Sequence, residues 1–528
     1  MEWDYVVVGG GSAGCVVASE LATDGDRRVV MLEHGDPAEA HPETLVADGY
    51  KAAFVNDHLL HERFSVPQPG LGGRRVYLGS GRGLGGSGSV NAMVYTRGAR
   101  EDYAAWPAGW HWDDVAPDFE RLEATLRVRP RPPTAFMETC IAAAEQVGFR
   151  RKADLNDGDL AGVLGYEAMN YEGEARRSSY VAFVKDRALP NLQVVTAAPA
   201  RRVLLENGRA VGVEVVRGGR SERFMAKRGV VLAAGALETP KLLMLSGLGP
   251  AAELRAVGIE PVLDVPGVGQ NLHDHPNVTL FFLGGQTTDC AYPQVYGFHR
   301  VGEGARLAPD QSDACFVFYP ARSSFREGMM RMLPAMALPP SLHGGGPLPG
   351  LMRRGIAAAF DRHAVQRLVA RLYGIVVILG KPLSRGQLRL TSADPTVPAA
   401  LDPAYFADPR DMDSMVAGVA RARALAGAPP LHGWGNREVI PGPFGQGRAG
   451  TERFIRQNGM TTYHYAGTCR MGDRDDDPVT PRLAFRGIAG LTVADASVIP
   501  ETPVSALNAP SMLIGLRAAR FMREDATP

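Results

Sequence analysis

The chain has 528 residues, of which 45% are hydrophobic and 22% are charged, and it carries 57 basic and 57 acidic side chains. At roughly 150 residues per domain, this length predicts two to four domains with a large core. The balanced charge removes the usual electrostatic reason to expect a nucleic-acid partner. The composition is that of an ordered globular protein rather than a disordered one.

The cysteine pattern and the N-terminus bear on the protein's surroundings. The five cysteines are odd in number and widely scattered, with no CxxC pair, so we expect no metal site and no disulfide framework. No apolar run reaches the ~18 residues of a membrane span. Residues 1–8 carry acids and lead directly into a strand, which predicts no signal peptide and a cytoplasmic protein.

The chain opens with the pattern of a βαβ unit. Residues 4–8 (DYVVV) form a β-branched run that ends in a glycine cluster, residues 12–22 have a helical pattern, and 29–33 (VVMLE) resemble a second buried strand. Such a unit predicts a parallel sheet with a right-handed crossover.

Later segments predict further strands and helices. Residues 191–216 have the pattern of a three-stranded meander with a hairpin turn at Asn207 and Gly208, and 229–234 that of a buried strand. Apolar residues at helical spacing, interleaved with arginines, predict one amphipathic helix over 355–372. Residues 386–391 and 491–495 resemble strands, and a helix is expected after Asn508.

A GxGxxG motif connects the first strand to the first helix. Gly9 allows a tight turn, Gly11 lets the backbone approach a pyrophosphate, and Gly14 lets the helix pack against the strand. Ser12 and Ala13 open the helix, whose N-terminus favours phosphate. Glu33 follows Gly14 by 19 residues, at the end of the second strand, where a carboxylate can accept both ribose hydroxyls of an adenosine. The alternative is a glycine-rich turn followed by an incidental acid.

The motif alone does not separate NAD from FAD. The segment 81–98 (GRGLGGSGSVNAMVYTRG) is dense in glycine and contains Asn91. A backbone of this kind suits a second loop that wraps a bulky planar cofactor.

Four segments, in chain order, resemble signatures of the glucose–methanol–choline (GMC) oxidoreductases, and most closely those of the choline-dehydrogenase-like branch. They are GRGLGGSGSVN (81–91), GALETPKLLMLSGLG (235–249), YHYAGTCRMG (463–472) and TVADASVIPETPVSALNAPSMLIGLRAA (492–519). The resemblance implies bound FAD and oxidation of an alcohol to a carbonyl. It implies an α/β FAD-binding domain of Rossmann-like GMC type, with an α+β substrate domain built on an antiparallel sheet.

The resemblance also suggests how the chain is divided. We expect the FAD-binding domain to comprise 1–155, 191–274 and 461–528, the last part carrying the catalytic residues. Residues 156–190 would connect the domains, and 275–460 would bind substrate. The stretch 281–380 matches no family pattern that we could use.

The cofactor contacts implied by the resemblance extend beyond the first motif. The FAD-binding residues are expected to be Gly9, Gly11, Ser12, Ala13, Gly14, Glu33, Arg82, Gly85, Gly86, Ser87, Asn91, Met93, Val94, Ala200, Ala234, Gly235, Asp495, Ala496, Asn508, Ala509 and Pro510. Some family members link FAD covalently through a His just before the Asn of the first signature. Val90 stands there in this chain, which predicts non-covalent FAD.

The catalytic groups are assigned on the same resemblance. His464 is expected to be the base, because neutral imidazole accepts a proton near pH 7, and its pKa is expected near 6–8. Asn508 would donate to the substrate oxygen and, with Pro510, begin a helix whose positive end stabilises reduced flavin. Tyr463 is placed on the substrate side. His273 and His275 are interpreted as structural or as supporting the site.

Residues 327–352 contain five methionines interleaved with prolines. With the helix expected over 355–372 they could form core and lid packing, an adaptable apolar mouth for a bulky alcohol, or a basic patch that touches a membrane surface. The second interpretation predicts a hydrophobic or aromatic alcohol.

The leading function is therefore a flavin-dependent alcohol dehydrogenase or oxidase, with dehydrogenase favoured by the branch. Oxygen, a quinone and a carrier protein all stay open as electron acceptors. The alternative is a non-redox member of the same fold, such as a hydroxynitrile lyase or a light-driven decarboxylase.

Overall fold

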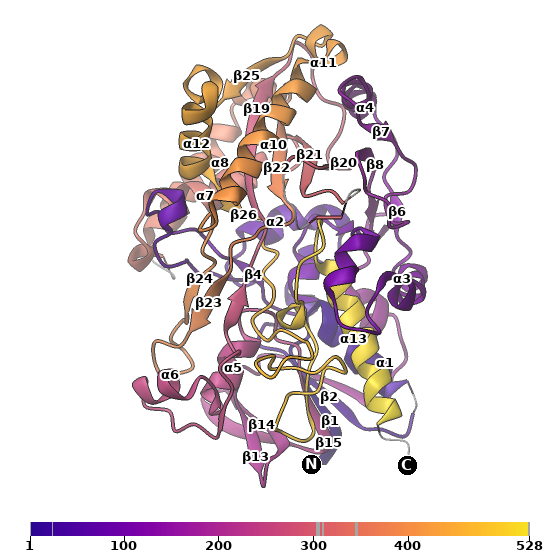
Figure 1. The fold of residues 1–528 in the computed structure, drawn as a ribbon, viewed down its shortest axis with the longest axis vertical. Helices are drawn as coiled ribbons and strands as arrows, with labels where there is room; N and C mark the ends of the chain where they lie inside the picture. Colours follow the sequence, from indigo (N-terminus) through magenta and orange to yellow (C-terminus); the bar gives the residue numbers. More distant parts are fainter. Residues whose placement is uncertain (1, 24, 303–306, 309–310, 344–346, 526–528) are drawn as a thin grey trace.

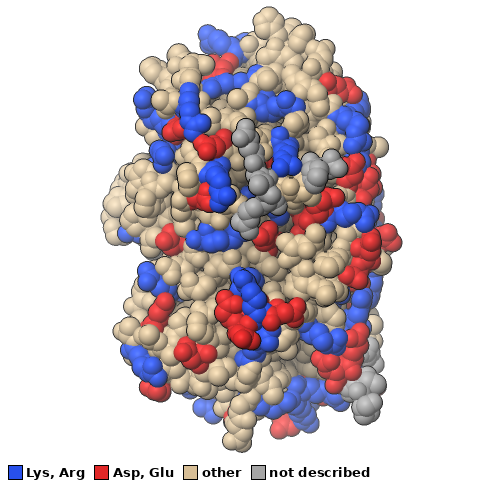
Figure 2. Space-filling view, viewed as in Figure 1, with Lys and Arg blue, Asp and Glu red and all other residues tan. Residues whose placement is uncertain are grey.

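The structure is a computed structural model that describes residues 2–23, 25–302, 307–308, 311–343 and 347–525. The molecule is elongated, with one sheet in each half, and the first and last described residues lie beside the first sheet (Figure 1). Within the described residues, no helix has the length and apolar character needed to cross a bilayer. On the face shown in Figure 2, basic and acidic side chains are interspersed.

The first sheet has seven strands and contains the predicted βαβ unit. Strand β1 (Glu2–Val8) lies between β2 (Val29–Leu32) and β15 (Arg220–Leu232) and is parallel to both, and α1 (Ser12–Ala22) connects β1 to β2. Strand β27 (Leu491–Val493) adds to the other side of β15 in parallel, as the buried run at 491–495 predicts. The carboxyl ends of these parallel strands therefore meet at one edge, where ligands of such sheets bind.

The predicted meander at 191–216 is wrong in its first strand. Strand β12 (Leu192–Val195) pairs in parallel with β2, and the meander consists of β13 (Ala200–Glu206), β14 (Arg209–Arg217) and β15. The chain after β12 stays beside the end of β2, because Ala198 N–H donates to Glu33 O and Ala197 N–H to Gly35 O. The hairpin turn at Asn207 and Gly208 is confirmed, with positive φ at both residues. The predicted strand at 229–234 is the end of β15.

The second sheet is antiparallel apart from one edge pair. Its strands run in the order β25 (Arg437–Ile440), β19 (Pro276–Leu283), β22 (Leu372–Leu379), β21 (Ala314–Pro320), β20 (Val295–His299), β8 (Val163–Tyr166) and β7 (Arg150–Arg151), with β26 (Met460–Thr461) also paired to β19. Strand β7 comes from the range that the sequence assigns to the FAD-binding part, so the chain enters this sheet earlier than expected.

The two faces of the second sheet have different neighbours. On β22, the side chain of Val377 faces α10 (Pro409–Gly427), where a Cβ on Gly418 would lie 2.7 Å from Val377 Cγ1. Val376 and Ile378 line a cavity instead. Successive side chains of β22 thus point alternately to α10 and to the cavity, as in any strand with neighbours on both faces. The second sheet therefore forms one wall of the cavity.

Helices α7 (Phe325–Ala337), α8 (Pro347–Phe360) and α9 (His363–Val369) precede β22. The single helix predicted over 355–372 is wrong. The chain is extended at Arg362, with φ −74° and ψ 129°, which separates α8 from α9. The apolar run from Leu372 onward belongs to the sheet, where its β-branched residues favour a strand.

The last helix, α13 (Asn508–Glu524), packs against α1. A Cβ on Gly515 would lie 2.5 Å from Ala13 O, so only glycine permits this close approach. The contact brings the N-terminal ends of the two helices together, at the edge where β1 ends (Figure 1).

The described chain also contains further α-helices and short strands. The helices are α2 (Tyr50–Val55), α3 (Trp112–Leu126), α4 (Ala135–Gln146), α5 (Thr239–Leu245), α6 (Ala251–Ala256), α11 (Pro429–Gly433) and α12 (Gly447–Asn458). The strands are β3 (Leu60–His61), β4 (Ser80–Gly81), β5 (Val94–Tyr95), β6 (Arg129–Pro130), β9 (Ala168–Met169), β10 (Tyr171–Glu172), β11 (Ala175–Arg176), β16 (Leu248–Gly249), β17 (Leu263–Asp264), β18 (Gln270–Leu272), β23 (Gly386–Arg389) and β24 (Ala400–Asp402). The strand predicted over 386–391 is thus confirmed as β23.

Candidate active site

A cavity of about 790 Å³ extends from the carboxyl ends of the first sheet to the second sheet. The loops after β1, β15 and β27 line one end, and residues of β19, β21, β22 and α7 line the other. We call these the loop end and the apolar end. This volume is large enough for a cofactor and a small substrate together.

The glycines of the first motif behave as a phosphate-binding turn requires. Gly9 has φ 101°, and a Cβ there would lie 2.4 Å from Ala233 O. A Cβ on Gly14 would lie 1.8 Å from Gly9 O, so helix α1 can pack on the turn only with glycine. Gly11 has no such neighbour nearer than 4.0 Å and faces the cavity. This open backbone at a helix N-terminus fits a pyrophosphate group.

The Glu33 carboxylate accepts hydrogen bonds from three backbone N–H groups at the loop end. Its Oε2 accepts from Gly10 N–H at 2.8 Å, and its Oε1 accepts from Gly35 N–H at 2.8 Å and Gly83 N–H at 3.0 Å. Glu33 also lines the cavity. The carboxylate therefore orders the glycine turn at Gly9–Gly14, which we call the glycine cradle. The position of Glu33 also suggests a contact with a ribose.

Asp495 likewise accepts hydrogen bonds from the loop after β15 and orders it. Its Oδ2 accepts from Gly235 N–H at 2.9 Å and from Thr239 Oγ1 at 2.6 Å, and its Oδ1 accepts from Ser497 N–H at 2.8 Å. Burial raises the pKa of this carboxyl above its ordinary value. Asp495 thereby fixes Gly235, which has φ 89° and an open Cβ direction at the cavity.

The second glycine loop is held from beneath by a buried arginine. Arg176 Nη1 donates to Gly88 O at 2.9 Å and to Asn91 Oδ1 at 2.8 Å, and its Nη2 donates to Asn91 O at 2.6 Å. The Asn91 oxygen also accepts from Met93 N–H at 2.9 Å. Burial lowers the pKa of Arg176 to about 9, so the guanidinium is charged at neutral pH. The Asn91 amide oxygen is thus used within the loop.

His464 lines the cavity on the segment that follows β26. Its backbone N–H donates to Asp274 Oδ1 at 2.8 Å, and Thr461 Oγ1 donates to Asp274 Oδ2 at 2.5 Å. Tyr405 OH also donates to this carboxylate. Asp274 therefore fixes the backbone that carries His464, and burial raises its pKa to about 6.

The His464 ring meets a second histidine. Nδ1 of His464 lies 3.0 Å from Nδ1 of His275, and the two rings are nearly perpendicular, at 85°. Burial lowers the pKa of His464 to about 4 and that of His275 well below its ordinary value. The expected pKa near 6–8 for His464 is therefore too high, because the sequence does not show how fully the ring is enclosed. Both rings are neutral at pH 7.

Asn508 is the first residue of α13 and touches the start of α1. Ser12 Oγ donates to Asn508 Oδ1 at 2.7 Å, which leaves the Nδ2 protons of Asn508 as donors at the cavity. A Cβ on Gly88 would lie 2.8 Å from Ser12 Oγ and 3.1 Å from Asn508 Oδ1. Gly88, which has no side chain, thus makes room for this contact. Two helix N-termini point their partial positive charge toward the same place.

The apolar end is built mainly from aromatic, aliphatic and methionine side chains. They include Phe54, Tyr77, Phe281, Val317, Tyr319, Phe325, Met329, Met332, Met336, Val376, Ile378 and Tyr463. The Tyr463 ring packs near Phe54 and Tyr77, with ring centres 6.1 and 6.5 Å away, and its hydroxyl lies 3.9 Å from Met332 Sδ. Among the described lining residues, the carboxylates are Glu33, Glu238 and Asp495, all at the loop end.

Most of the residues that the sequence points to line this cavity. They are Gly9, Gly11, Ser12, Ala13, Glu33, Gly86, Ser87, Asn91, Val94, Ala200, Ala234, Gly235, Tyr463, His464, Asp495, Ala496 and Asn508. Gly14, Gly85, Met93, Ala509 and Pro510 do not, and they lie in the turns and helix starts that carry the lining residues.

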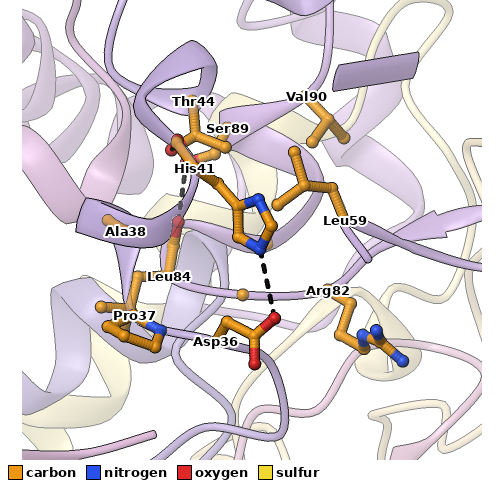
Figure 3. A pocket seen from close by; sticks show the side chains of 12 residues that line it. Asp36, Pro37, Ala38, His41, Thr44, Leu59, Arg82, Leu84, Ser89 and Val90 are labelled. Carbon is orange, nitrogen blue, oxygen red and sulfur yellow. Dashed lines mark hydrogen bonds and ion pairs between the residues drawn. The ribbon is translucent and has the colours of Figure 1, made fainter. Parts of the chain in front are cut away.

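Arg82 does not line the cavity. It borders a small separate pocket next to the pair formed by Asp36 and His41, whose Oδ2 and Nε2 are 3.1 Å apart (Figure 3). Arg82 Nε donates to His58 O at 3.0 Å. This position gives Arg82 a role in holding the loop rather than in lining the cavity.

Sequence reasoning missed several residues at the site. Arg176 has no motif of its own, and the sequence indicates His275 only as a structural or supporting residue. The aromatic residues Phe54 and Tyr77 come from a loop-rich region without periodicity. The signal that was available for His275 is its position in the segment GVGQNLHDHP, which leads into β19.

Comparison with known proteins agrees with this geometry. The family models described as GMC oxidoreductase match residues 3–277 and 382–515. The chain is 32% identical to an alcohol dehydrogenase [acceptor] of Pseudomonas putida, over 98% of this chain and 95% of the relative. It is also 32% identical to an oxygen-dependent choline dehydrogenase of Rhizobium rhizogenes (strain K84 / ATCC BAA-868), with the same shares covered.

Solved structures share the whole fold. A pyridoxine 4-oxidase from Mesorbium loti superposes with a TM-score of 0.83 at 25% identity, covering 98% of this chain and 99% of that one. A fungal aryl-alcohol oxidase superposes with a TM-score of 0.75 at 22% identity, covering 100% of both chains. With the two family models covering more than half of its length, the chain belongs to the GMC oxidoreductase family.

Proposed function

We propose that this GMC oxidoreductase binds FAD and oxidises a hydrophobic or aromatic alcohol to the carbonyl compound. The observation that carries the proposal is that a neutral histidine, His464, lines the same cavity as the glycine cradle. The cradle fits the pyrophosphate of a dinucleotide, because Gly11 and Gly235 leave open backbone at the cavity. FAD, when bound, supplies the hydride acceptor for the reaction.

The residues of the chain would handle the substrate's proton and oxygen. Neutral His464 can accept the hydroxyl proton, provided that its Nε2 carries the lone pair. The Asn508 amide can donate to the same oxygen as negative charge develops on it. The N-terminus of α13 adds positive potential there. The apolar end limits water around these groups and so strengthens each interaction.

The substrate class follows from the walls of the apolar end. A quaternary ammonium such as choline is held best where a carboxylate lies beside aromatic rings, and a sugar needs many polar partners. The described carboxylates of the cavity are at the loop end, while methionine and aromatic side chains form the apolar end. Methionine adapts its shape to irregular apolar ligands. We therefore propose that hydrophobic and aromatic alcohols are preferred over choline and glucose.

We propose that the enzyme works as a dehydrogenase rather than an oxidase. Support comes from the relative at 32% identity that is named as an alcohol dehydrogenase [acceptor]. Comparing anaerobic turnover by an artificial acceptor with hydrogen peroxide formation in air tests this point. Peroxide formation as fast as dye reduction would contradict it.

The flavin is proposed to be held without a covalent bond, because Val90 offers no linking atom. Acid precipitation of the yellow protein should leave FAD in the supernatant. Flavin colour that stays with the pellet would contradict this proposal.

The test of the whole proposal is anaerobic mixing with a panel of alcohols while the flavin absorbance is recorded. Benzyl alcohol and long-chain primary alcohols should bleach the flavin, and choline and glucose should do so with lower kcat/KM. A His464→Ala variant that keeps its FAD should bleach about 10²–10⁴-fold more slowly, the usual effect of losing a general base. If no alcohol of the panel bleaches the flavin, the proposed function is wrong and the non-redox alternative is favoured. Bleaching of the variant at the wild-type rate would remove His464 from the reaction.

A further inference from the structure

Exposed apolar side chains gather on one part of the surface. Among the described residues, the large apolar side chains that are exposed are Val46, Val262, Leu333, Met336, Leu342, Leu348, Leu351, Leu368, Val397, Ile440 and Phe444. Six of these eleven fall between residues 333 and 368, the segment that contains the end of α7 together with α8 and most of α9. Large contiguous apolar patches are rare on soluble monomers and usually mark a site of contact.

Helix α8 exposes mainly apolar side chains, which is unusual for a helix at the protein surface. Its exposed residues are Pro347, Leu348, Leu351, Arg354, Gly355, Ala358 and Ala359, so Arg354 is the one polar side chain among them. Pro349 is its only buried residue. A surface helix normally buries its apolar stripe and shows water its polar face. We therefore expect the exposed apolar face of α8 to contact another molecule.

This surface, formed by 333–343 and 347–368, adjoins the mouth of the cavity. Met336 lines the apolar end and is 55% exposed. Ile440 also lines the cavity and is 43% exposed, and Phe444, four residues further along, is 85% exposed. At the left edge of Figure 2, at the height of α7 in Figure 1, uncharged surface predominates. The apolar end of the cavity therefore opens to solvent between apolar side chains.

The same surface is positively charged in a chain with no net charge. Residues 347–368 contain four arginines and one acid, Asp361, which pairs with Arg326. Arg354, Arg362 and Arg367 are exposed and form no ion pair with another described residue. Apolar side chains bordered by unpaired arginines complement a surface that is anionic outside and apolar beneath.

We propose that the surface formed by residues 333–343 and 347–368 docks on an anionic phospholipid bilayer. Helix α8 would lie in the interface, with Leu348 and Leu351 among the acyl chains and the arginines at the headgroups. At 14 residues it is too short to span the bilayer. A second copy of the chain fits less well, because a symmetric contact would set the same arginines against one another.

Docking in this way would turn the mouth at Met336 and Ile440 toward the lipid. An alcohol dissolved in the bilayer could then enter the apolar end without crossing water. This consequence rests on the proposed substrate class, whereas the docking itself does not. The experiment below therefore measures binding to lipid separately from turnover.

The test is flotation of the FAD-loaded protein with vesicles of phosphatidylcholine alone or mixed with phosphatidylglycerol. We expect binding to the mixed vesicles at low salt that weakens as salt rises. The triple variant R354Q/R362Q/R367Q should bind about 100-fold more weakly, since each arginine near an anionic surface contributes about fivefold. The double variant L348S/L351S should lose at least about tenfold. V262S, which changes an exposed valine outside the patch, serves as the control and should bind as the wild type does.

Turnover of a water-soluble alcohol by L348S/L351S should match the wild type, which shows that the variant is folded. Three results would overturn the proposal. The first is no flotation with mixed vesicles at low salt. The second is flotation that neither set of substitutions weakens. The third is a dimer in solution that L348S/L351S dissociates, since a second copy would then be the occupant of the surface.

Discussion

His464 and His275 face each other through the same ring nitrogen, with their Nδ1 atoms 3.0 Å apart. Since both rings are neutral, one Nδ1 must carry a proton and the other must accept it. If His464 donates, its Nε2 holds a lone pair and can act as a base. If His275 donates, His464 carries its proton on Nε2 and cannot. We propose that His464 donates and His275 accepts, which would make His275 a positioning residue for the His464 ring.

This relationship predicts the effect of changing His275. His275→Ala removes the acceptor of the His464 proton, so flavin reduction by an alcohol should slow about 10–100-fold while FAD stays bound. His275→Asn, which can still accept near the position of Nδ1, should recover part of the rate. Stopped-flow reduction under anaerobic conditions measures both, with kcat affected more than KM.

The matched control is His273→Asn. His273 is also buried, but its Nδ1 lies 2.7 Å from Asn271 O and it does not line the cavity. A loss of rate in His273→Asn equal to that in His275→Ala would mean that both histidines act only through stability. No recovery by His275→Asn would also argue against the tautomer role.

The pH dependence follows from the lowered pKa of His464, which is about 4. A lowered pKa means that the neutral, proton-accepting form is present above pH 4 and is lost as the pH falls through that value. Flavin reduction should therefore be level between about pH 6.5 and 8, as far as His464 is concerned. The pKa of Asp274 is raised to about 6, so a step near pH 6 that vanishes in Asp274→Asn belongs to Asp274. A step between pH 7 and 8 that vanishes in His464→Ala would show that the ring is less enclosed in the working enzyme.

Glu33 is predicted to stabilise the protein even without FAD. Its carboxylate accepts three backbone N–H groups, so Glu33→Ala leaves three donors without a partner in and around the cradle. We expect a loss of about 2–4 kcal/mol in the free energy of unfolding of the apoprotein, together with weaker FAD binding. Urea denaturation of the apoprotein measures the first effect and flavin fluorescence the second. Glu39→Ala, an exposed acid nearby, is the control. Unchanged apoprotein stability in Glu33→Ala would limit its role to the ribose.

The sequence predicts the first sheet well because its signals are local. A β-branched run, a glycine turn and a helix must lie next to one another in the chain, and the βαβ rule then fixes their pairing. The partner of a short strand is not a local property. Nothing in residues 192–195 shows that they pair with β2 instead of β13, since that choice depends on which sheet edge is free.

Site residues that belong to a contiguous motif can be predicted from the sequence. Contacts and pKa values that depend on burial in the folded chain cannot. His464, Asn508 and the glycines come from contiguous signatures. The 3.0 Å contact between His464 and His275 joins positions that are 189 residues apart, and the low pKa of both rings depends on all the segments that enclose them. Arg176 is a similar case, because its partners Gly88 and Asn91 lie more than eighty residues earlier in the chain.

Arg176 yields the last prediction. Its guanidinium satisfies two carbonyl oxygens and the Asn91 amide oxygen beneath the second glycine loop, and it is fully buried. Arg176→Lys keeps a charge but cannot reach three acceptors in one plane, because an ammonium is a compact point charge. FAD should then bind about 10–100-fold more weakly, as expected when one or two buried hydrogen bonds that order the loop are lost.

Fluorescence titration of the apoprotein with FAD measures this affinity. Arg177→Lys is the matched control, because Arg177 is almost as buried but contacts Asp186 and Thr125 O instead of the loop. If both variants lose FAD affinity equally, the effect comes from general destabilisation. If Arg176→Lys binds FAD as tightly as the wild type does, the loop between Gly86 and Asn91 is ordered without the guanidinium, and the cradle under the cofactor depends on the glycines and Glu33 alone.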